Sequence, residues 1–309
     1  MALRELFSTK HVTSEVEIGV TNLCNARCVH CPTTRRVDSQ VMAPETFATL
    51  LSRYEAHYPV DVPRPKFLFA GSGEPLLNKH LEGFVAQTVQ RGFRTGIITN
   101  ATPLTRPRFL ALVKAGLDEL YISVQGTAAT YHDLMGLDYD KVISRVRMVA
   151  EYLAQNPDAT LDFHVVSSDI AEDGVNAAEI KEFWGRMGVR HLGPFPVWNR
   201  AGNLKNYEDV VRPESSVSKV NFELPAWCLV LKYKDSIDAD GSFVKCECDF
   251  FGAAETYGNV HTDTLAEVYE RYEEILTAAE PPRSCRMCIK SGTGFFIEQH
   301  KEMATKGSK

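Results

Sequence analysis

Residues 21–32 read Thr-Asn-Leu-Cys-Asn-Ala-Arg-Cys-Val-His-Cys-Pro and place three of the chain's eight cysteines in one short stretch. Cys24, Cys28 and Cys31 follow a C-x3-C-x2-C spacing, which lets one loop turn three thiolates onto a single metal centre. Soft thiolates favour zinc or iron–sulfur centres. A structural zinc site needs four ligands and has paired C-x2-C knuckles, which this stretch lacks. We therefore expect a four-iron cluster in which one iron has no protein ligand and can bind a small molecule.

Strand and helix patterns alternate around this loop. Val16, Ile18 and Val20 alternate with polar residues or glycine, so a strand over 15–21 is expected to end where the loop begins. Further strands are expected at 66–70, 94–99, 119–124, 160–166 and about 189–197. Helices are expected at 44–57, from Leu81 to a stop at Gly92, and at 106–115, 139–155 and 175–187. Six strand–helix units predict a parallel sheet with right-handed crossovers, two units short of a closed TIM barrel.

Composition and charge restrict the class of protein. The 309 residues are 44% hydrophobic and 24% charged, as in an ordinary globular protein. A net charge of −6 argues against nucleic acid as a general partner, because no basic stripe is present to release counterions. The N-terminus has no signal-peptide pattern, and no apolar stretch approaches the ~18 residues of a membrane span. We therefore expect a cytoplasmic protein with no membrane partner, whose cysteines are metal ligands rather than disulfides.

The second chemical motif is Gly71-Ser72-Gly73-Glu74-Pro75, directly after the strand expected at 66–70. Glycines there let the backbone approach a ligand, and the carboxylate can pair with an ammonium group. Together with the cysteine spacing, this loop resembles the radical S-adenosylmethionine (SAM) family. The resemblance implies an α/β fold with a partial (β/α)6 TIM-like barrel and its chemistry at the carboxyl ends of the strands. It also implies that SAM binds the open iron and that one electron cleaves it to a 5′-deoxyadenosyl radical.

The same resemblance assigns SAM-binding positions. Gly73 and Glu74 match the family's GGEP motif, which holds the SAM amino group, while Ser72 replaces the usual first glycine. His30 occupies the place of an aromatic residue that packs on the adenine, although a solvated loop histidine fits the sequence equally well. Asn100 stands in a Thr-Asn-Ala variant of the family's Thr-Asn-Gly motif and is also assigned to SAM binding, and Ser123 and Gln125 match strand-end positions that contact the SAM ribose or carboxylate.

The C-terminal cysteines form a second group. Four thiolates of the pattern C…C…C-x2-C can hold either zinc or a fully ligated four-iron cluster. The resemblance to the short twitch form of the SPASM extension favours the cluster. It implies an auxiliary 4Fe-4S cluster on Cys228, Cys246, Cys285 and Cys288. Two strands over 229–247, joined by a turn at Asp240-Gly241, and a helix over about 264–279 are expected in this part.

Cys248 is left without a partner in this scheme. Two residues past Cys246 on a strand, it would face the same side as that ligand. It is then a small buried hydrophobe, an alternative ligand, or a catalytic thiol that gives a hydrogen atom to a substrate radical.

Three reactions follow from these alternatives. A catalytic Cys248 predicts an epimerase that inverts a sugar carbon of an aminoglycoside-type substrate. Without that role, the auxiliary cluster predicts a dehydrogenase that oxidises an aminocyclitol or amino-sugar alcohol to a ketone. Peptide modification, as in many SPASM proteins, is the third. The expected partners are a small-molecule substrate, a cationic amino sugar, and an electron donor of the flavodoxin or ferredoxin type. The expected domains are a barrel at 1–200, a linker at 201–221 and a cluster domain at 222–309.

Overall fold

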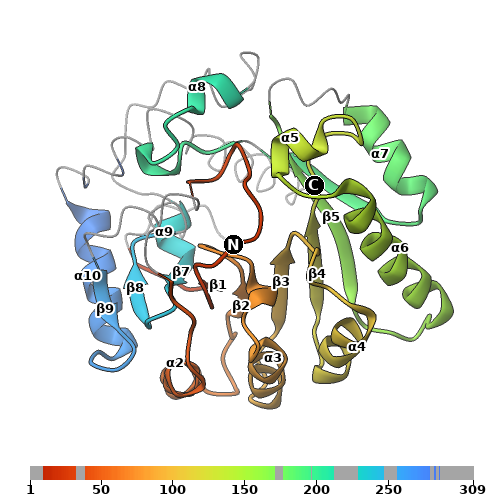
Figure 1. Ribbon diagram of the computed structural model, residues 1–309. Helices are drawn as coiled ribbons and strands as arrows, with labels where there is room; N and C mark the ends of the chain where they lie inside the picture. Colours follow the sequence, from red (N-terminus) through yellow and green to blue (C-terminus); the bar gives the residue numbers. More distant parts are fainter. Residues whose placement is uncertain are drawn as a thin grey trace, which may run out of the picture.

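One β-sheet with helices packed along it organises the molecule (Figure 1). The computed structural model describes residues 10–32, 39–170, 177–195, 197–211, 229–246 and 256–278, with Pro282 and Cys285. Within these residues the sheet order is β6-β5-β4-β3-β2-β1-β7-β8-β9. The pairings from β6 through β1 to β7 are parallel, and β8 and β9 are added antiparallel.

The predicted α/β partial barrel is confirmed in the first two-thirds of the chain. Its strands are β1 Glu15–Ile18, β2 Lys66–Phe69, β3 Thr95–Thr99, β4 Glu119–Ser123, β5 Asp162–Ser168 and β6 Arg190–Phe195. Its helices are α2 Pro44–His57, α3 Leu81–Gln90, α4 Arg106–Ala115, α5 Tyr131–Met135, α6 Tyr139–Gln155 and α7 Ala177–Arg186. Shorter helical turns are η2 Pro75–Leu77, η3 Arg200–Gly202 and α8 Tyr207–Val210.

Local chemistry sets the helix boundaries. The Thr105 side chain caps α4 by accepting a hydrogen bond from the Arg108 N–H, and Gly116 ends it with a left-handed φ of 91°. Asp138 caps α6 in the same way, accepting from the Lys141 N–H. These two helices and α2 therefore have the predicted bounds. Strand β1 is shorter than predicted and ends at Ile18.

The core lies between the sheet and the helices. Phe47 of α2 stacks on Phe84 of α3 with ring centroids 4.2 Å apart and also meets Phe69 of β2 at 5.9 Å. All three rings are buried. Burying one such side chain contributes roughly 1.5–3 kcal/mol, so these contacts fix α2 and α3 against β2, the strand that carries the glycine loop.

The C-terminal part joins the same sheet. Its elements are α9 Leu229–Tyr233, β7 Lys234–Ile237, β8 Ser242–Val244, β9 Thr256–Asn259 and α10 Leu265–Thr277. Strand β7 pairs in parallel with β1, with Glu15 opposite Lys234 and Ile18 opposite Ile237. The turn between β7 and β8 contains Gly241 at φ 84°, where a side chain would be strained. A domain boundary at residue 222 stays a prediction, but β7 extends the barrel sheet beyond it.

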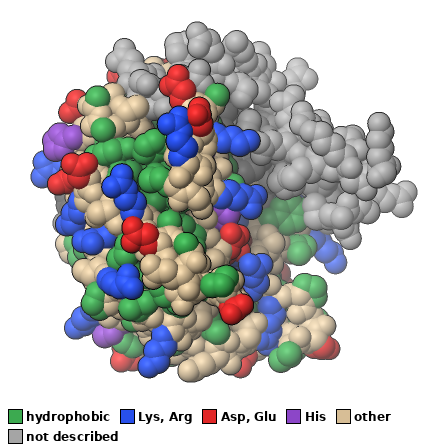
Figure 2. Space-filling model, turned by 90° about the vertical axis from the view of Figure 1, so that its right-hand side faces the viewer, with side chains coloured by type: hydrophobic (Ala, Val, Ile, Leu, Met, Phe, Trp, Pro, Cys, Tyr) green, Lys and Arg blue, Asp and Glu red, His purple; other side chains and the backbone are tan. Residues whose placement is uncertain are grey.

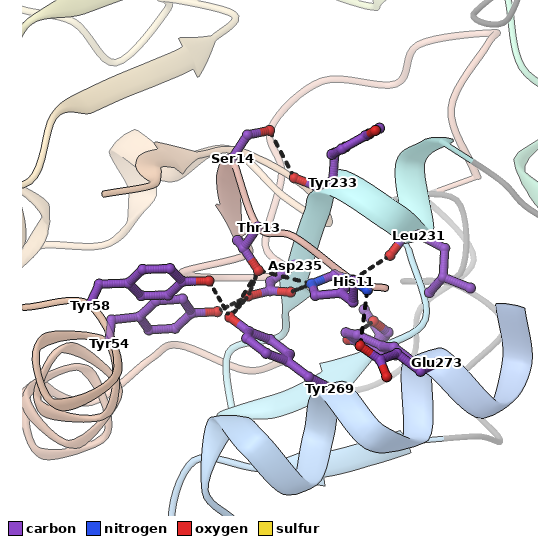
Figure 3. Close-up of polar contacts among 12 residues, drawn as sticks. His11, Thr13, Ser14, Tyr54, Tyr58, Leu231, Tyr233, Asp235, Tyr269 and Glu273 are labelled. Carbon is purple, nitrogen blue, oxygen red and sulfur yellow. Dashed lines mark hydrogen bonds and ion pairs between the residues drawn. The ribbon is translucent and has the colours of Figure 1, made fainter. Parts of the chain in front are cut away.

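A buried polar cluster fixes this C-terminal part to the barrel (Figure 3). Asp235 of β7 accepts hydrogen bonds from Tyr54 of α2 at 2.5 Å and from Tyr269 of α10 at 3.0 Å. Its other contacts are Thr13 Oγ1 at 3.0 Å and His11 Nε2 at 2.8 Å. We call His11, Thr13, Tyr54, Asp235 and Tyr269 the Asp235 cluster. It joins four segments that lie far apart in the sequence.

The outer face beside α6 and α7 carries mixed charges. Figure 2 shows acidic and basic side chains interspersed there around an apolar area. In the described part of the chain, no helix is both long and apolar enough to span a membrane.

Candidate radical SAM site

The cysteine loop, residues 19–32, leaves the carboxyl end of β1. Cys24 is exposed, Cys28 and Cys31 are half-buried, and none of the three is in a disulfide. Helix α5 holds the loop on both sides of Cys28. The Arg27 N–H donates to the Met135 carbonyl at 2.9 Å, and the Val29 N–H donates to the Leu134 carbonyl at 3.0 Å. This short helix, which periodicity did not predict, therefore positions the predicted ligands.

The loop's donor chemistry fits an iron–sulfur cluster. Burial raises the pKa of the Cys28 thiol well above its usual value, and the neighbouring Cys31 and Cys24 raise that pKa further. Cysteine ligates metal as the thiolate, so binding of a cationic cluster would release the protons of these ligands. The Ala26 N–H donates a hydrogen bond to Cys24 Sγ, with 3.4 Å between nitrogen and sulfur. Among the described residues, no group of three Cys, His, Asp or Glu side chains is arranged to hold a metal ion.

The Gly-Ser-Gly-Glu-Pro loop after β2 packs directly on the cysteine loop. The Glu74 N–H donates to the Leu23 carbonyl at 2.8 Å. A Cβ added at Gly73 would lie 2.3 Å from the Thr21 carbonyl oxygen and 2.6 Å from that of Leu23. Position 73 must therefore be glycine for this approach. The two predicted motifs form one structure at the carboxyl ends of β1 and β2.

The Glu74 carboxylate faces the protein. One oxygen accepts from the Thr99 hydroxyl at 2.6 Å and the Leu76 N–H at 3.0 Å, and the other accepts from the Asn100 N–H at 2.8 Å. Burial raises the pKa of Glu74, while these donors oppose the rise. Glu74 thus ties the ends of β2 and β3 together. Its predicted contact with the SAM amino group stays a prediction.

The other predicted SAM-binding residues divide into two groups. Ser72, Asn100 and Gln125 are buried and bonded to the protein. Ser72 Oγ donates to Asp238 at 3.2 Å, Asn100 Nδ2 to Asn25 at 3.0 Å, and Gln125 Oε1 accepts from the Ser168 N–H at 2.7 Å. His30 and Ser123 instead line a cavity. Burial and the nearby Arg200 lower the pKa of His30 to about 4, so its ring is neutral at pH 7.

That cavity has a volume of about 530 Å³ and lies inside the barrel. Its wall includes residues from β1, β2, β4, β5, β6 and β7, and His30 brings the cysteine loop to its edge. A space of this size is typical of a site for small organic molecules.

Five charged side chains line or support the base of this cavity, and we call them the ion belt: Glu15, Glu17, Lys66, Glu119 and Lys234. Lys66 Nζ lies 3.1 Å from Glu15 and 2.8 Å from Glu119. Lys234 Nζ lies 3.0 Å from Glu15 and 2.9 Å from Glu17. Burial acts to raise the pKa of Glu15, but the two lysines outweigh it and hold that pKa below its usual value. The cavity therefore offers carboxylates and ammonium groups side by side.

The sequence reasoning missed the lysines of the belt and Arg200. Lys66 and Lys234 each begin a strand, and only the sheet order brings them together. Arg200 lines the cavity with a left-handed φ of 50°, and Ala201 follows at 55°. Such backbone conformations cost non-glycine residues about 1–2 kcal/mol each and concentrate at functional sites. Nearby, Asn206 Nδ2 donates to the Val29 carbonyl at 3.1 Å, so the predicted linker returns to the cysteine loop.

The auxiliary site is described only in part. Cys246 and Cys285 are half-buried and in no disulfide. Cys228, Cys248 and Cys288 lie outside the described residues. The predicted ligand set and the predicted role of Cys248 therefore stay predictions.

Replacing Gly73 by alanine is expected to weaken SAM binding more than about tenfold, or 1.4 kcal/mol. The new methyl group would push the glycine loop away from the Thr21 and Leu23 carbonyls. Equilibrium binding of SAM to the reconstituted protein measures the effect. Gly83→Ala in α3 is the matched control, because its Cβ meets nothing within 4 Å and alanine there should stabilise the helix by about 1 kcal/mol. Equal SAM affinity in both variants would contradict the packing argument.

Known proteins resemble the chain in both sequence and fold. S-adenosyl-L-methionine-dependent 2-deoxy-scyllo-inosamine dehydrogenase of Niallia circulans is 30% identical over 139 residues, which are 42% of this chain and 54% of that protein. The match thus spans about half the length of that relative.

Two solved structures share the fold. The crystal structure of BtrN in complex with AdoMet and 2-DOIA matches with a TM-score of 0.58 and 19% identity, over 91% of this chain and 89% of that one. The structure of anSMEcpe with bound AdoMet matches with a TM-score of 0.63 and 16% identity, over 91% and 88%. Residues 18–173, just over half of the chain, match the model of the radical SAM superfamily. The chain belongs to this superfamily.

Proposed function

We propose that this protein is a radical SAM dehydrogenase that oxidises a secondary alcohol of an aminocyclitol or amino sugar to a ketone. Membership of the superfamily implies SAM and one 4Fe-4S cluster. With the cluster held by Cys24, Cys28 and Cys31 and SAM bound to it, the two together would supply a radical that removes a hydrogen atom from a substrate carbon. The dehydrogenase relative supports oxidation over the epimerisation favoured by Cys248 alone.

We infer the substrate class from the cavity, which is lined by residues of both the cysteine loop and the ion belt. His30 of the loop and the belt residues Glu15, Glu17, Lys66 and Lys234 line the same space. Carboxylates accept hydrogen bonds from ammonium and hydroxyl groups, and lysines donate to hydroxyl oxygens. Since each belt lysine is already paired with carboxylates, the cavity suits a hydroxylated amine better than a strongly anionic substrate.

The oxidation removes two electrons and two protons from the alcohol. The first hydrogen atom leaves the carbon, and loss of one further electron and the hydroxyl proton gives the ketone. We propose an auxiliary 4Fe-4S cluster on Cys228, Cys246, Cys285 and Cys288 as acceptor of that electron, and a flavodoxin- or ferredoxin-type protein as donor to the SAM site. One SAM is consumed for each ketone.

Epimerisation is the second candidate, because Cys248 is a fifth cysteine in addition to the four that the auxiliary cluster needs. In that reaction a thiol returns hydrogen to the opposite face of the carbon. Since thiol hydrogens exchange with solvent, the epimerised carbon would acquire deuterium in D2O.

The test is anaerobic turnover of the reconstituted protein in D2O with SAM, a reductant and 2-deoxy-scyllo-inosamine. Mass spectrometry is expected to show a product two hydrogens lighter and 5′-deoxyadenosine in equal amount. An isomer carrying one deuterium, lost in Cys248→Ala while 5′-deoxyadenosine is still formed, would establish the epimerase instead. If this substrate underwent no SAM-dependent change, the assignment of the substrate class would be overturned.

A further inference from the structure

Tyr131, the first residue of α5, carries a buried hydroxyl group beneath the cysteine loop. Its side chain is 0% exposed, and its hydroxyl has no hydrogen-bond partner within the described residues. Leaving a buried hydroxyl unpaired costs roughly 1–3 kcal/mol. Buried polar groups in native proteins are rarely left unpaired, so this hydroxyl calls for a specific explanation, such as a partner that is bound only in the holoprotein.

Helix α5 is fixed directly against the segment that contains Cys28. Its last residues accept the backbone N–H groups on either side of that cysteine, at 2.9 Å and 3.0 Å. Gly136, which ends the helix, is so close that a Cβ there would lie 3.0 Å from Arg27 Cβ. The helix cannot move away from Cys28 without breaking these contacts.

Tyr131 lies within one helical turn of Leu134 and Met135, whose carbonyls accept the N–H groups on either side of Cys28. Burial raises the pKa of Tyr131 most, and a negative charge at Cys28, as in a bound thiolate, would raise that pKa further. On the other side, the ring meets Tyr139 edge-on, with centroids 5.4 Å apart.

We propose that the Tyr131 hydroxyl donates a hydrogen bond to the Cys28 sulfur when that thiolate ligates the iron–sulfur cluster, and thereby raises the reduction potential of the cluster. Donors to cluster sulfurs stabilise the reduced form, which carries the extra negative charge. Tyr131 is a positioning and tuning residue, because it acts through a ligand and touches neither SAM nor substrate. The proposal rests on Cys28 as a ligand and is independent of the dehydrogenase assignment.

The first experiment compares the reconstituted holoproteins of the wild type and Tyr131→Phe. An EPR-monitored redox titration is expected to show unchanged iron content and a more negative midpoint potential for the SAM-site cluster. A tenfold change in the reduced-to-oxidised ratio corresponds to 59 mV for one electron. Tyr139→Phe is the matched control, since the charges that act on that phenol are those of Asp140 and Arg147. Its midpoint should equal that of the wild type.

The second measurement uses protein without the cluster. Because the hydroxyl is unpaired there, Tyr131→Phe is expected to be at least as stable to denaturant as the wild type. A merely structural tyrosine would instead lower stability and leave the midpoint unchanged, and that result would overturn the proposal.

A third measurement detects the proposed hydrogen bond directly. Wild-type protein refolded and reconstituted in D2O should show an exchangeable deuteron coupled to the reduced cluster by double-resonance EPR, and Tyr131→Phe should lose that coupling. A coupling that persists in the variant would assign the donor to the backbone and refute the role of Tyr131.

Discussion

Alanine at Cys24, Cys28 and Cys31 together is expected to remove the SAM-site cluster and abolish SAM cleavage. Each 4Fe-4S cluster holds four irons, so the reconstituted wild type with two clusters should contain about eight irons and the variant about four. The variant should still fold, because the cysteine loop is held by backbone hydrogen bonds to α5 and by the contact between Glu74 and Leu23. Iron and sulfide analysis with a 5′-deoxyadenosine assay checks both expectations.

The matched control removes the described auxiliary cysteines Cys246 and Cys285. That double variant should also lose about half of the iron, but it should retain SAM cleavage without substrate. Four irons and one zinc in the wild type would identify the auxiliary site as a structural zinc site and exclude the proposed dehydrogenase. Full SAM cleavage in the triple variant would refute the assignment of the three ligands.

Asp235→Ala is expected to destabilise the protein by about 3–5 kcal/mol, the usual cost of removing one partner from a buried charged network. The substitution would leave the hydroxyls of Tyr54 and Tyr269 and the His11 ring without their shared acceptor. All of these residues are buried, so water cannot replace the carboxylate without opening the packing. Urea unfolding of the cluster-free protein measures the change.

The control for this prediction is Ser14→Ala. Its hydroxyl donates to the Tyr233 carbonyl at 3.0 Å in an exposed position of the same region, so its loss should cost less than about 1 kcal/mol. If Asp235→Ala and Ser14→Ala unfolded at the same urea concentration, the Asp235 cluster would not fix β7 and α10 to the barrel.

Several features of the fold were predictable because their causes are local in the chain. The bounds of α2, α4 and α6 follow from a proline at the first position of α2, from Thr105 and Asp138 as caps, and from apolar stripes of helical period. Helix α5 was not predicted, because five residues are too few to show a period. Strand β9 was also missed. The residues expected to begin the first C-terminal strand are helical, as α9.

Within the site, the motifs were predictable and the contacts were not. Cysteine spacing and the Gly-Ser-Gly-Glu-Pro loop indicated the superfamily, since ligand spacing within one loop is a property of the sequence. The direction of the Glu74 carboxylate, toward Thr99 and Asn100 rather than into the cavity, depended on how the ends of β2 and β3 meet.

By itself, the sequence determined the superfamily, the parallel α/β architecture and the presence of five cysteines beyond the three of the cysteine loop. These features depend on cysteine spacing, hydrophobic periodicity and helix capping, which act over a few residues. Only the tertiary structure decided that Lys234 lies beside Glu15 and Glu17 in the ion belt, and that Asp235 meets His11 across more than two hundred residues. The physical reason is the parallel pairing of β7 with β1. Strand order is set by the packing of the whole sheet, and no local pattern in either strand records it.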